Sequence, residues 1–360
     1  MTYLQELQEL VALHARAQNM DMGRCRKILA RINSVDQLGE GGWGSEWQRE
    51  GDSDVAAGKF ESAFQYYNLA RFPYPVNEDM YASHEKCVTT FMSWATKKGL
   101  DLKRLSIRID SVDIPFYFSS AGKNKPLLLV MGGIVSIKEQ WQAFLWAAKK
   151  LGVSVLVAEM PGVGENKLVY DRSAYDFISE LIDAVQDEAD VSHTHIVAMS
   201  FSGNLALRQA MDDSRIRAIT TVGAPVHQFF TDAQWWQQVP LTTKRTLAYL
   251  CKVDESEVFA YISRFAIEGE ELAALKIPVY YVRSVNDEII PPGEKAMLVN
   301  NLASLSLREY QDVHGSPNHM SDLQKYVPFT VLKEAGTNKV AQTMLNFLLA
   351  LGGMKRAVGV

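Results

Sequence analysis

Cysteine is scarce in this sequence. The 360 residues include only three, Cys25, Cys87 and Cys251, an odd number spread widely along the chain. They form no CxxC pair and no zinc-ligand spacing, so neither a disulfide framework nor a zinc site is expected. The sequence therefore predicts buried free thiols in a reducing compartment, and with them a cytoplasmic protein.

Long apolar runs and blocks of one charge are also missing. The longest apolar runs, such as residues 126–135, are too short to span a bilayer, and the N-terminus lacks the apolar stretch of a signal peptide. The formal net charge is only −5, without a Lys/Arg block, so neither nucleic acid nor a membrane surface is an expected partner. The phosphate-binding patterns GxxxxGK[ST] and GxGxxG are absent, and we expect no cofactor and no metal.

The first hundred residues indicate a helical region. Apolar residues recur every three to four positions over 4–17, 54–72 and 77–98, and each segment predicts a helix. The glycine-rich stretch 38–54 is predicted to be a loop in which Trp43 and Trp47 anchor packing. We expect residues 1–102 to form a helical cap or lid domain, whose His14 and His84 are assigned to surface or core.

From residue 103 onward, strands alternate with helices. Residues 104–120 predict a two-stranded hairpin, and near-continuous apolar strands separated by amphipathic helices follow it. This alternation is typical of a mostly parallel, doubly wound sheet with helices on both faces. A helical stretch at about 227–272 interrupts the alternation, so residues 103–360 are predicted to be an α/β core with a helical insertion.

A serine, an acid and a histidine each follow one of the predicted strands. Ser200 follows "HIVAM", Asp287 follows "VYYVRSVN" and His314 follows "LREYQDV". Sites in open α/β sheets lie beyond the carboxyl ends of the strands, and Ser…Asp…His is the chain order of the α/β-hydrolase fold. In that chemistry the histidine takes the serine proton and the carboxylate orients the histidine. The sequence therefore predicts an α/β-hydrolase fold with this triad.

The turn after "HIVAM" offers two serines. With Ser200 as the nucleophile, Ala198 and Ser202 occupy the two positions that a tight turn requires to be small. With Ser202 as the nucleophile, Asn204 would occupy the second small position. The pattern favours Ser200.

The acid and the base each have an alternative candidate nearby in the sequence. Asp287 comes first after its strand, and Glu288 is expected to be solvated. His314 directly follows its strand and is favoured over His319, which lies five residues later.

An oxyanion hole and a substrate pocket are expected beside these residues. Backbone N–H groups should supply the hole, one from Phe201 and one from the turn at Gly133 or Ile134. Substrates would enter between the core and a lid made of the N-terminal helices and the insertion. We expect the insertion to contribute aromatic substrate contacts: Phe229, Phe230, Trp235 and Trp236.

These motifs, taken together, resemble one group of α/β-hydrolases. The chain is similar to the group containing 2,6-dihydroxypseudooxynicotine hydrolase, the FrsA-like proteins and the fungal pigment-pathway polyketide-shortening hydrolases. The group's turn motif G-G-x-D-S-x-K-E corresponds to residues 132–139, with Val135 in place of the aspartate. Its nucleophile motif G-x-S-x-G-G-N/Y corresponds to residues 198–204, where both elbow glycines are substituted. The resemblance implies cleavage of esters or of carbon–carbon bonds beside a ketone, often by a dimer.

The sequence as a whole predicts a serine hydrolase acting on a carbonyl substrate. The expected substrate is a small-molecule or carrier-bound acyl compound, bulky, aromatic or polyketide-like, attacked at an ester, a thioester or a β-diketone. Two alternatives stay open: an acyltransferase or cyclase using the same site, and a non-catalytic binding protein on a hydrolase scaffold.

Overall fold

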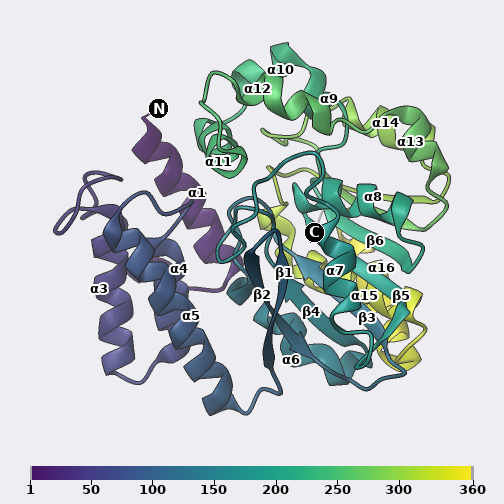
Figure 1. The fold of residues 1–360 in the computed structure, drawn as a ribbon, viewed down its shortest axis with the longest axis horizontal. Helices are drawn as coiled ribbons and strands as arrows, with labels where there is room; N and C mark the ends of the chain where they lie inside the picture. Colours follow the sequence, from purple (N-terminus) through teal and green to yellow (C-terminus); the bar gives the residue numbers. More distant parts are fainter. Residues whose placement is uncertain (1, 358–360) are drawn as a thin grey trace.

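The N-terminal region is a group of helices. In the computed structural model, which describes residues 2–357, these are α1 (Tyr3–Ala17), α2 (Met22–Leu29), α3 (Trp43–Ala56), α4 (Phe60–Ala70) and α5 (Glu78–Lys98). Thr2 and Gln5 form a capping box at the start of α1, and Asn77 caps α5. Figure 1 shows this group beside the sheet, with α1 lying between the other N-terminal helices and α11 (Leu241–Cys251).

The loop predicted over 38–54 is largely a helix. Residues from Trp43 onward form α3, and the helix predicted over 54–72 is divided at Gly58, whose φ is +70°. Trp43 and Trp47 lie one turn apart on α3 and are fully buried, and the indole N–H of Trp43 donates to the Leu69 carbonyl at 2.8 Å. Their burial outweighs the low helix propensity of the glycines. The prediction that both tryptophans anchor packing is confirmed.

The core is one eight-stranded sheet in the order β1-β2-β4-β3-β5-β6-β7-β8. The predicted hairpin forms β1 and β2; β2 also pairs antiparallel with β4, and the other neighbours are parallel. This is the predicted α/β-hydrolase fold. The strands are β1 (Lys103–Ile109), β2 (Val112–Ser119), β3 (Pro126–Met131), β4 (Ser154–Ala158), β5 (Asp190–Met199), β6 (Ile216–Val222), β7 (Val279–Ser284) and β8 (Leu305–Tyr310).

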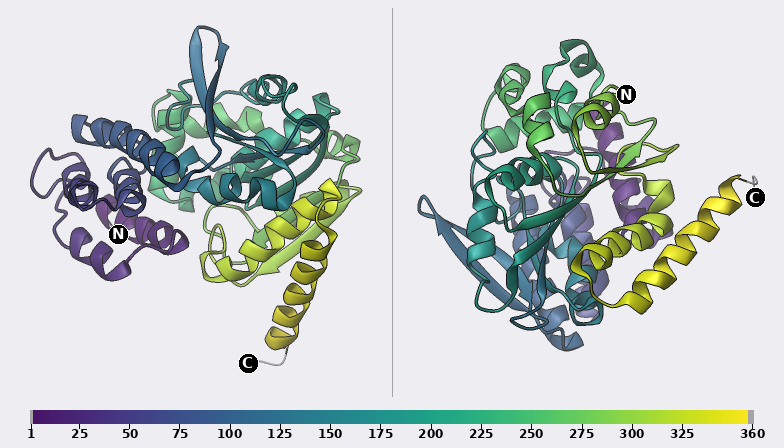
Figure 2. Two further views of the ribbon diagram at one scale, coloured as in Figure 1. Left: turned by 90° about the horizontal axis from the view of Figure 1, so that it is seen from below. Right: turned by 90° about the vertical axis from the view of Figure 1, so that its right-hand side faces the viewer.

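Helices cover both faces of the sheet (Figure 2). One of them, α15, was not predicted: Pro328 interrupts its pattern, but Leu323, Val327 and Val331 recur every four residues and are buried. Another of them, α7, covers only Phe177–Asp183. The helices of the core outside the insertion are α6 (Gln142–Leu151), α7, α8 (Ser202–Asp212), α14 (Glu294–Asn301), α15 (Met320–Ala335) and α16 (Lys339–Ala357), which packs on α15, with short 3₁₀ turns η1 (Lys138–Trp141) and η3 (Pro317–His319).

The insertion between β6 and β7 is helical, as predicted. It arches over the same end of the sheet as α1 (Figure 1). The Glu6 carboxylate of α1 accepts the N–H groups of Leu241 and Thr242, at 3.1 and 2.5 Å, and so caps α11. The insertion comprises α9 (Gln228–Thr231), α10 (Ala233–Gln238), α11, α12 (Val258–Ile262), η2 (Ser263–Phe265) and α13 (Gly269–Ala274).

The cysteines and the apolar helices bear on two further expectations from the sequence. The three cysteines are buried free thiols, as predicted. Within residues 2–357, no helix combines the length and apolar character that crossing a membrane requires.

Candidate active site

Three strand ends bring Ser200, His314 and Asp287 into one hydrogen-bonded row. Ser200 lies in the turn between β5 and α8, Asp287 follows β7 and His314 follows β8. The Oγ of Ser200 lies 2.9 Å from Nε2 of His314. The Nδ1 of His314 lies 2.9 and 3.0 Å from the two carboxylate oxygens of Asp287. The hydroxyl, imidazole and carboxylate are therefore ordered as nucleophilic catalysis requires.

The turn geometry distinguishes the two serines. Ser200 has φ +57°, a left-handed conformation that costs energy for a non-glycine residue and is typical of a nucleophile elbow. Its N–H donates to the Val222 carbonyl at 2.8 Å, which fixes the turn. Ser202 is fully buried and its hydroxyl donates to the Met199 carbonyl at 2.9 Å, so it serves the start of α8.

The two histidines also separate. His319 stacks on Tyr310 with ring centroids 4.5 Å apart, and its Nδ1 lies 2.7 Å from the buried carboxylate of Asp312. It makes no contact with Ser200. Burial lowers the pKa of His314, but the charge and hydrogen bond of Asp287, with a smaller effect of Glu288, outweigh burial and raise that pKa above its usual value.

The acid is held by its own loop. One carboxylate oxygen of Asp287 accepts the backbone N–H groups of Ile289 and Ile290, at 2.9 and 2.8 Å. Glu288, expected to be solvated, instead accepts the backbone N–H of His314 at 3.0 Å and lines the cavity next to Ser200. Both acids of this loop thus fix the histidine, one through its ring and one through its backbone.

The turn after β3 approaches the nucleophile closely. A Cβ added at Gly133 would lie 2.9 Å from the Cβ of Ser200, so only glycine keeps the space beside Ser200 open. Within residues 2–357, the backbone N–H groups of Ile134 and Phe201 donate to no protein acceptor. These are two of the three residues that the sequence predicts for an oxyanion hole, and both donors are free for one.

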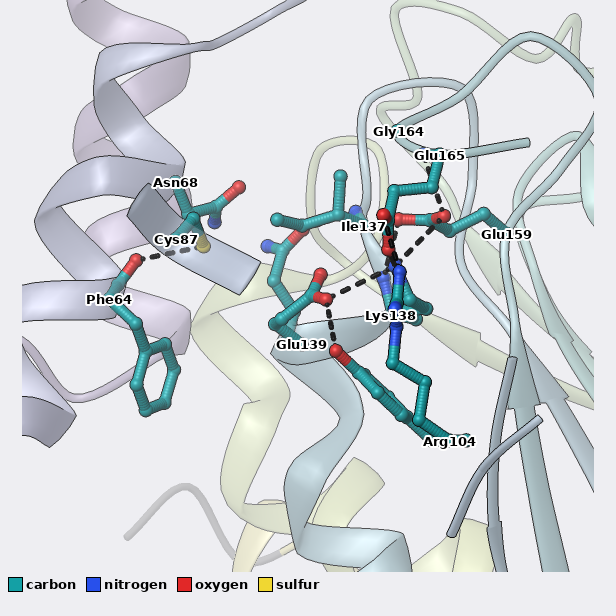
Figure 3. A network of polar contacts seen from close by, with 12 residues as sticks. Phe64, Asn68, Cys87, Arg104, Ile137, Lys138, Glu139, Glu159, Gly164 and Glu165 are labelled. Atoms are coloured by element: carbon teal, nitrogen blue, oxygen red, sulfur yellow. Dashed lines mark hydrogen bonds and ion pairs between the residues drawn. The ribbon is translucent and has the colours of Figure 1, made fainter. Parts of the chain in front are cut away.

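A buried charge network anchors this turn to the sheet (Figure 3). The ammonium of Lys138 lies 3.1, 3.3 and 2.6 Å from carboxylates of Glu139, Glu159 and Glu165. The Tyr117 hydroxyl of β2 donates to Glu139 at 2.8 Å. Burial would lower the pKa of Lys138, but the three carboxylates raise it, so the ammonium stays charged.

The N-terminal region holds the same turn from its other end. Arg71, at the end of α4, is almost fully buried and donates to the carbonyls of Val135 and Pro73, at 2.5 and 3.1 Å. Its remaining donors bind the side chain of Asn68. Arg71 was not among the predicted site residues, because no local pattern links residue 71 to residue 135.

A cavity of about 530 Å³ opens at Ser200, and most of its wall is apolar. Residues of α1, α4, α6, α11 and α15 line it, so the N-terminal helices and the insertion both contribute to its wall. Its polar side chains include His14 of α1, which was predicted to lie at the surface or in the core. His14 shares the apolar face of its helix with Leu10, which lines the same cavity.

The four aromatic residues predicted to contact substrate do not line this cavity. Phe229 and Phe230 are fully buried, and Phe229 packs edge-on against Phe201 and Trp236. Trp235 donates its indole N–H to the Ile289 carbonyl at 2.7 Å. These aromatic side chains pack the insertion onto the core. In the cavity wall, the insertion instead contributes the threonine face of α11. That face consists of Thr242, Thr243 and Thr246.

No group of three or more potential His, Cys, Asp or Glu metal ligands occurs within residues 2–357. The groups gathered around the Ser200 hydroxyl are the imidazole of His314, the carboxylates of Asp287 and Glu288, and free backbone N–H groups. Such a set supports acyl chemistry at a carbonyl carbon.

Comparison with known proteins places the chain in a family. The family model "Esterase FrsA-like" matches residues 42–276. The chain is 26% identical over 247 residues to Esterase FrsA of Vibrio cholerae serotype O1 (strain ATCC 39541 / Classical Ogawa 395 / O395), which is 59% of each chain. The chain thus spans less than two thirds of the length of that relative.

Two solved structures extend the comparison. Wild-type AbyA5 is 37% identical, with 96% of this chain and 99% of that chain covered at a TM-score of 0.92. The 2,6-dihydroxy-pseudo-oxynicotine hydrolase is 20% identical, with 79% and 88% covered at a TM-score of 0.67, and shares the fold. The resemblance inferred from the sequence is confirmed: the chain belongs to the FrsA-like esterase family.

Proposed function

We propose that this chain is a serine hydrolase that cleaves a carboxylic ester carrying a bulky, largely apolar group. The observation that carries the proposal is the 2.9 Å contact between Ser200 Oγ and His314 Nε2, made from a left-handed turn at the wall of an apolar cavity. The esterase description of the family supports an ester as the substrate.

The proposed reaction has two half-reactions. Ser200 Oγ attacks the carbonyl carbon while His314 Nε2 takes the serine proton, and Asp287 stabilises the imidazolium. The tetrahedral intermediate collapses, the bond to the leaving oxygen breaks, and His314 returns its proton to the alcohol. Water then attacks the acyl-Ser200 ester with His314 again as the base, which releases the acid and regenerates the serine.

The developing negative charge needs donors that are already in place. The free N–H groups of Phe201 and Ile134 supply two hydrogen bonds to the oxyanion, and Gly133 keeps the space between them and Ser200 open. Removing a donor from such a site typically costs about a hundred- to a thousandfold in kcat. Lys138 and Arg71 act indirectly, by fixing the turn that carries Ile134.

The cavity volume suits a drug-sized ester or the end of a longer acyl chain. We propose that α1 and α11 act as the lid, since both line the cavity and Glu6 joins them. A carrier-bound thioester would present the same carbonyl to Ser200. The homodimer implied by the family resemblance stays a prediction, which light scattering of the purified chain tests.

Turnover of a panel of esters, thioesters and β-diketones by the wild-type chain and its Ser200→Ala variant tests the proposal. We expect ester hydrolysis to fall by a factor of a thousand or more in Ser200→Ala, with one ¹⁸O from labelled water in the acid product of the wild type. Full turnover by Ser200→Ala would contradict the proposal. Unlabelled product joined to an added alcohol or amine would indicate an acyltransferase, and ligand binding without turnover a binding protein.

A further inference from the structure

The lid helix α1 carries an imidazole into the cavity, and the proposed chemistry does not use it. His14 lines the same cavity as Ser200 and His314, and its neighbours there on α1 include Leu10, Leu13 and Ala17. The adjoining part of the helix surface is fixed by burial of Leu7, Val11 and Ala15. A polar ring amid aliphatic side chains is costly in an apolar wall unless it meets a hydrogen-bonding partner.

The ring of His14 has no such partner in the part of the chain that the structure describes. Within residues 2–357, neither ring nitrogen forms a hydrogen bond, and the ring packs against Phe72, with 5.0 Å between the ring centroids. Nearby cavity glutamines differ, because Gln18 donates its amide to the His14 carbonyl at 3.3 Å and Gln65 donates to the Gln18 carbonyl at 3.2 Å. The imidazole is therefore free for a ligand while its polar neighbours are already engaged.

His14 is also held in its neutral form. Burial, followed by the positive charges of Arg71 and His314, lowers its pKa to about 4. A neutral imidazole offers one N–H donor and one acceptor nitrogen. It therefore suits an uncharged oxygen such as a ketone or hydroxyl, and it offers no charge to a carboxylate or phosphate.

The position of His14 is fixed relative to the rest of the cavity. Glu6 joins α1 to the start of α11, and the ring of Tyr3 lies under the guanidinium of Arg245, 4.3 Å away. A hydrogen bond from a donor that is already held in place contributes more to binding free energy than one from a mobile loop, because less conformational entropy is lost on binding.

We propose that His14 is a substrate-binding residue that selects acyl substrates bearing a ketone or hydroxyl oxygen along the chain, away from the scissile carbonyl. The proposal rests on the proposed function, since the oxygen is recognised while Ser200 holds the carbonyl. A site built around a hydrogen bond discriminates strongly against an analogue that lacks the bonding oxygen, because its own polar group is then buried unpaired.

A matched series of 4-nitrophenyl octanoates tests the proposal: the plain ester and the 4-, 5-, 6- and 7-oxo esters. We expect kcat/KM of the wild type for at least one oxo ester to exceed that for the plain ester about tenfold or more. His14→Phe should reduce this ratio to below about two, in part by raising kcat/KM for the plain ester, whose binding no longer leaves a buried imidazole unpaired. His14→Gln, which keeps a donor, should retain part of the preference.

Glu9→Gln, on the exposed side of α1, is the control and should keep the wild-type ratio. An unchanged ratio in His14→Phe, or a wild type that hydrolyses all five esters equally, would overturn the role of His14 while leaving the serine hydrolase in place. A wild type that hydrolyses none of them, and whose Ser200 resists a fluorophosphonate, would overturn the proposed function and this inference with it.

Discussion

Gly223 packs directly against the imidazole of His314. A methyl group at Gly223 would lie 2.8 Å from His314 Cε1 and 3.1 Å from Nδ1. Gly223 also has φ +63° at the end of β6, a conformation that only glycine adopts without cost. This one residue therefore sets how closely the histidine can approach the line between Ser200 and Asp287.

Gly223→Ala should displace the imidazole and uncouple it from both partners. We expect kcat for ester hydrolysis to fall at least tenfold, since hydrogen-bond geometry at the base is lost. Gly58→Ala is the matched control: its φ is +70°, and a Cβ there meets nothing within 4 Å. Both variants should lose about 1–2 kcal/mol of stability from backbone strain. Equal kcat values for the two variants would refute the steric role of Gly223.

Arg71→Lys should loosen the turn that carries Ile134. Lysine keeps a positive charge but cannot reach the carbonyls of Val135 and Pro73 and the Asn68 side chain with the geometry of a guanidinium. We expect kcat to fall about ten- to a hundredfold with a smaller change in KM, because the oxyanion is stabilised mainly in the transition state. Steady-state kinetics beside urea unfolding would separate this loss from a general loss of stability. A variant that is only less stable, with wild-type kcat, would leave Arg71 with a purely structural role.

Glu288→Gln should shift the pH profile of the reaction. The base must be neutral, so activity rises with pH through the His314 pKa, which lies above its usual value because Asp287 and Glu288 outweigh burial. Removing the Glu288 charge lowers that pKa and moves the acidic limb of kcat/KM to lower pH. The amide oxygen of glutamine still accepts the His314 N–H. Asp187→Asn, at an exposed and remote site, is the control and should leave the acidic limb at its wild-type pH. If the acidic limbs of Glu288→Gln and Asp187→Asn lie at the same pH, the Glu288 charge does not raise the His314 pKa.

Low pH should reduce the free energy of unfolding, because His195 is buried in its neutral form. Burial lowers the pKa of His195 to about 3 from the usual 6.5, so between these values the unfolded chain binds a proton that the folded chain does not. The free energy of unfolding should therefore fall as pH falls from 6.5, by about 2 kcal/mol at pH 5 from this residue. His195→Gln should lose part of this acid sensitivity in urea titrations at pH 7 and 5, whereas His193→Gln, at an exposed site, should keep all of it. Parallel losses in the two variants would contradict this.

Much of the fold and the order of the site residues could be predicted from the sequence. A parallel sheet collects the carboxyl ends of its strands at one edge, so three local patterns sufficed to place Ser200, Asp287 and His314 together. Helix α3 was not predicted, because the glycines of this stretch indicated a loop. The burial of Trp43 and Trp47, which stabilises the helix, depends on tertiary packing that the local sequence does not show.

The cavity wall could not be predicted in this way. It depends on contacts between α1 and α11, some 235 residues apart, and on Arg71 reaching the turn at Val135. Aromatic composition alone suggested that Phe229 and Phe230 contact substrate, but the same side chains satisfy the core, and only their packing against Phe201 and Phe265 distinguishes the two roles. Local sequence patterns carry no information on such pairings.

Covalent labelling with a fluorophosphonate, followed by intact-mass spectrometry and peptide mapping, tests the central claim most directly. An activated serine predicts one adduct per chain, located on Ser200, absent from Ser200→Ala and strongly slowed in His314→Ala. An adduct on Ser202, or labelling of Ser200→Ala at the wild-type rate, would contradict the account.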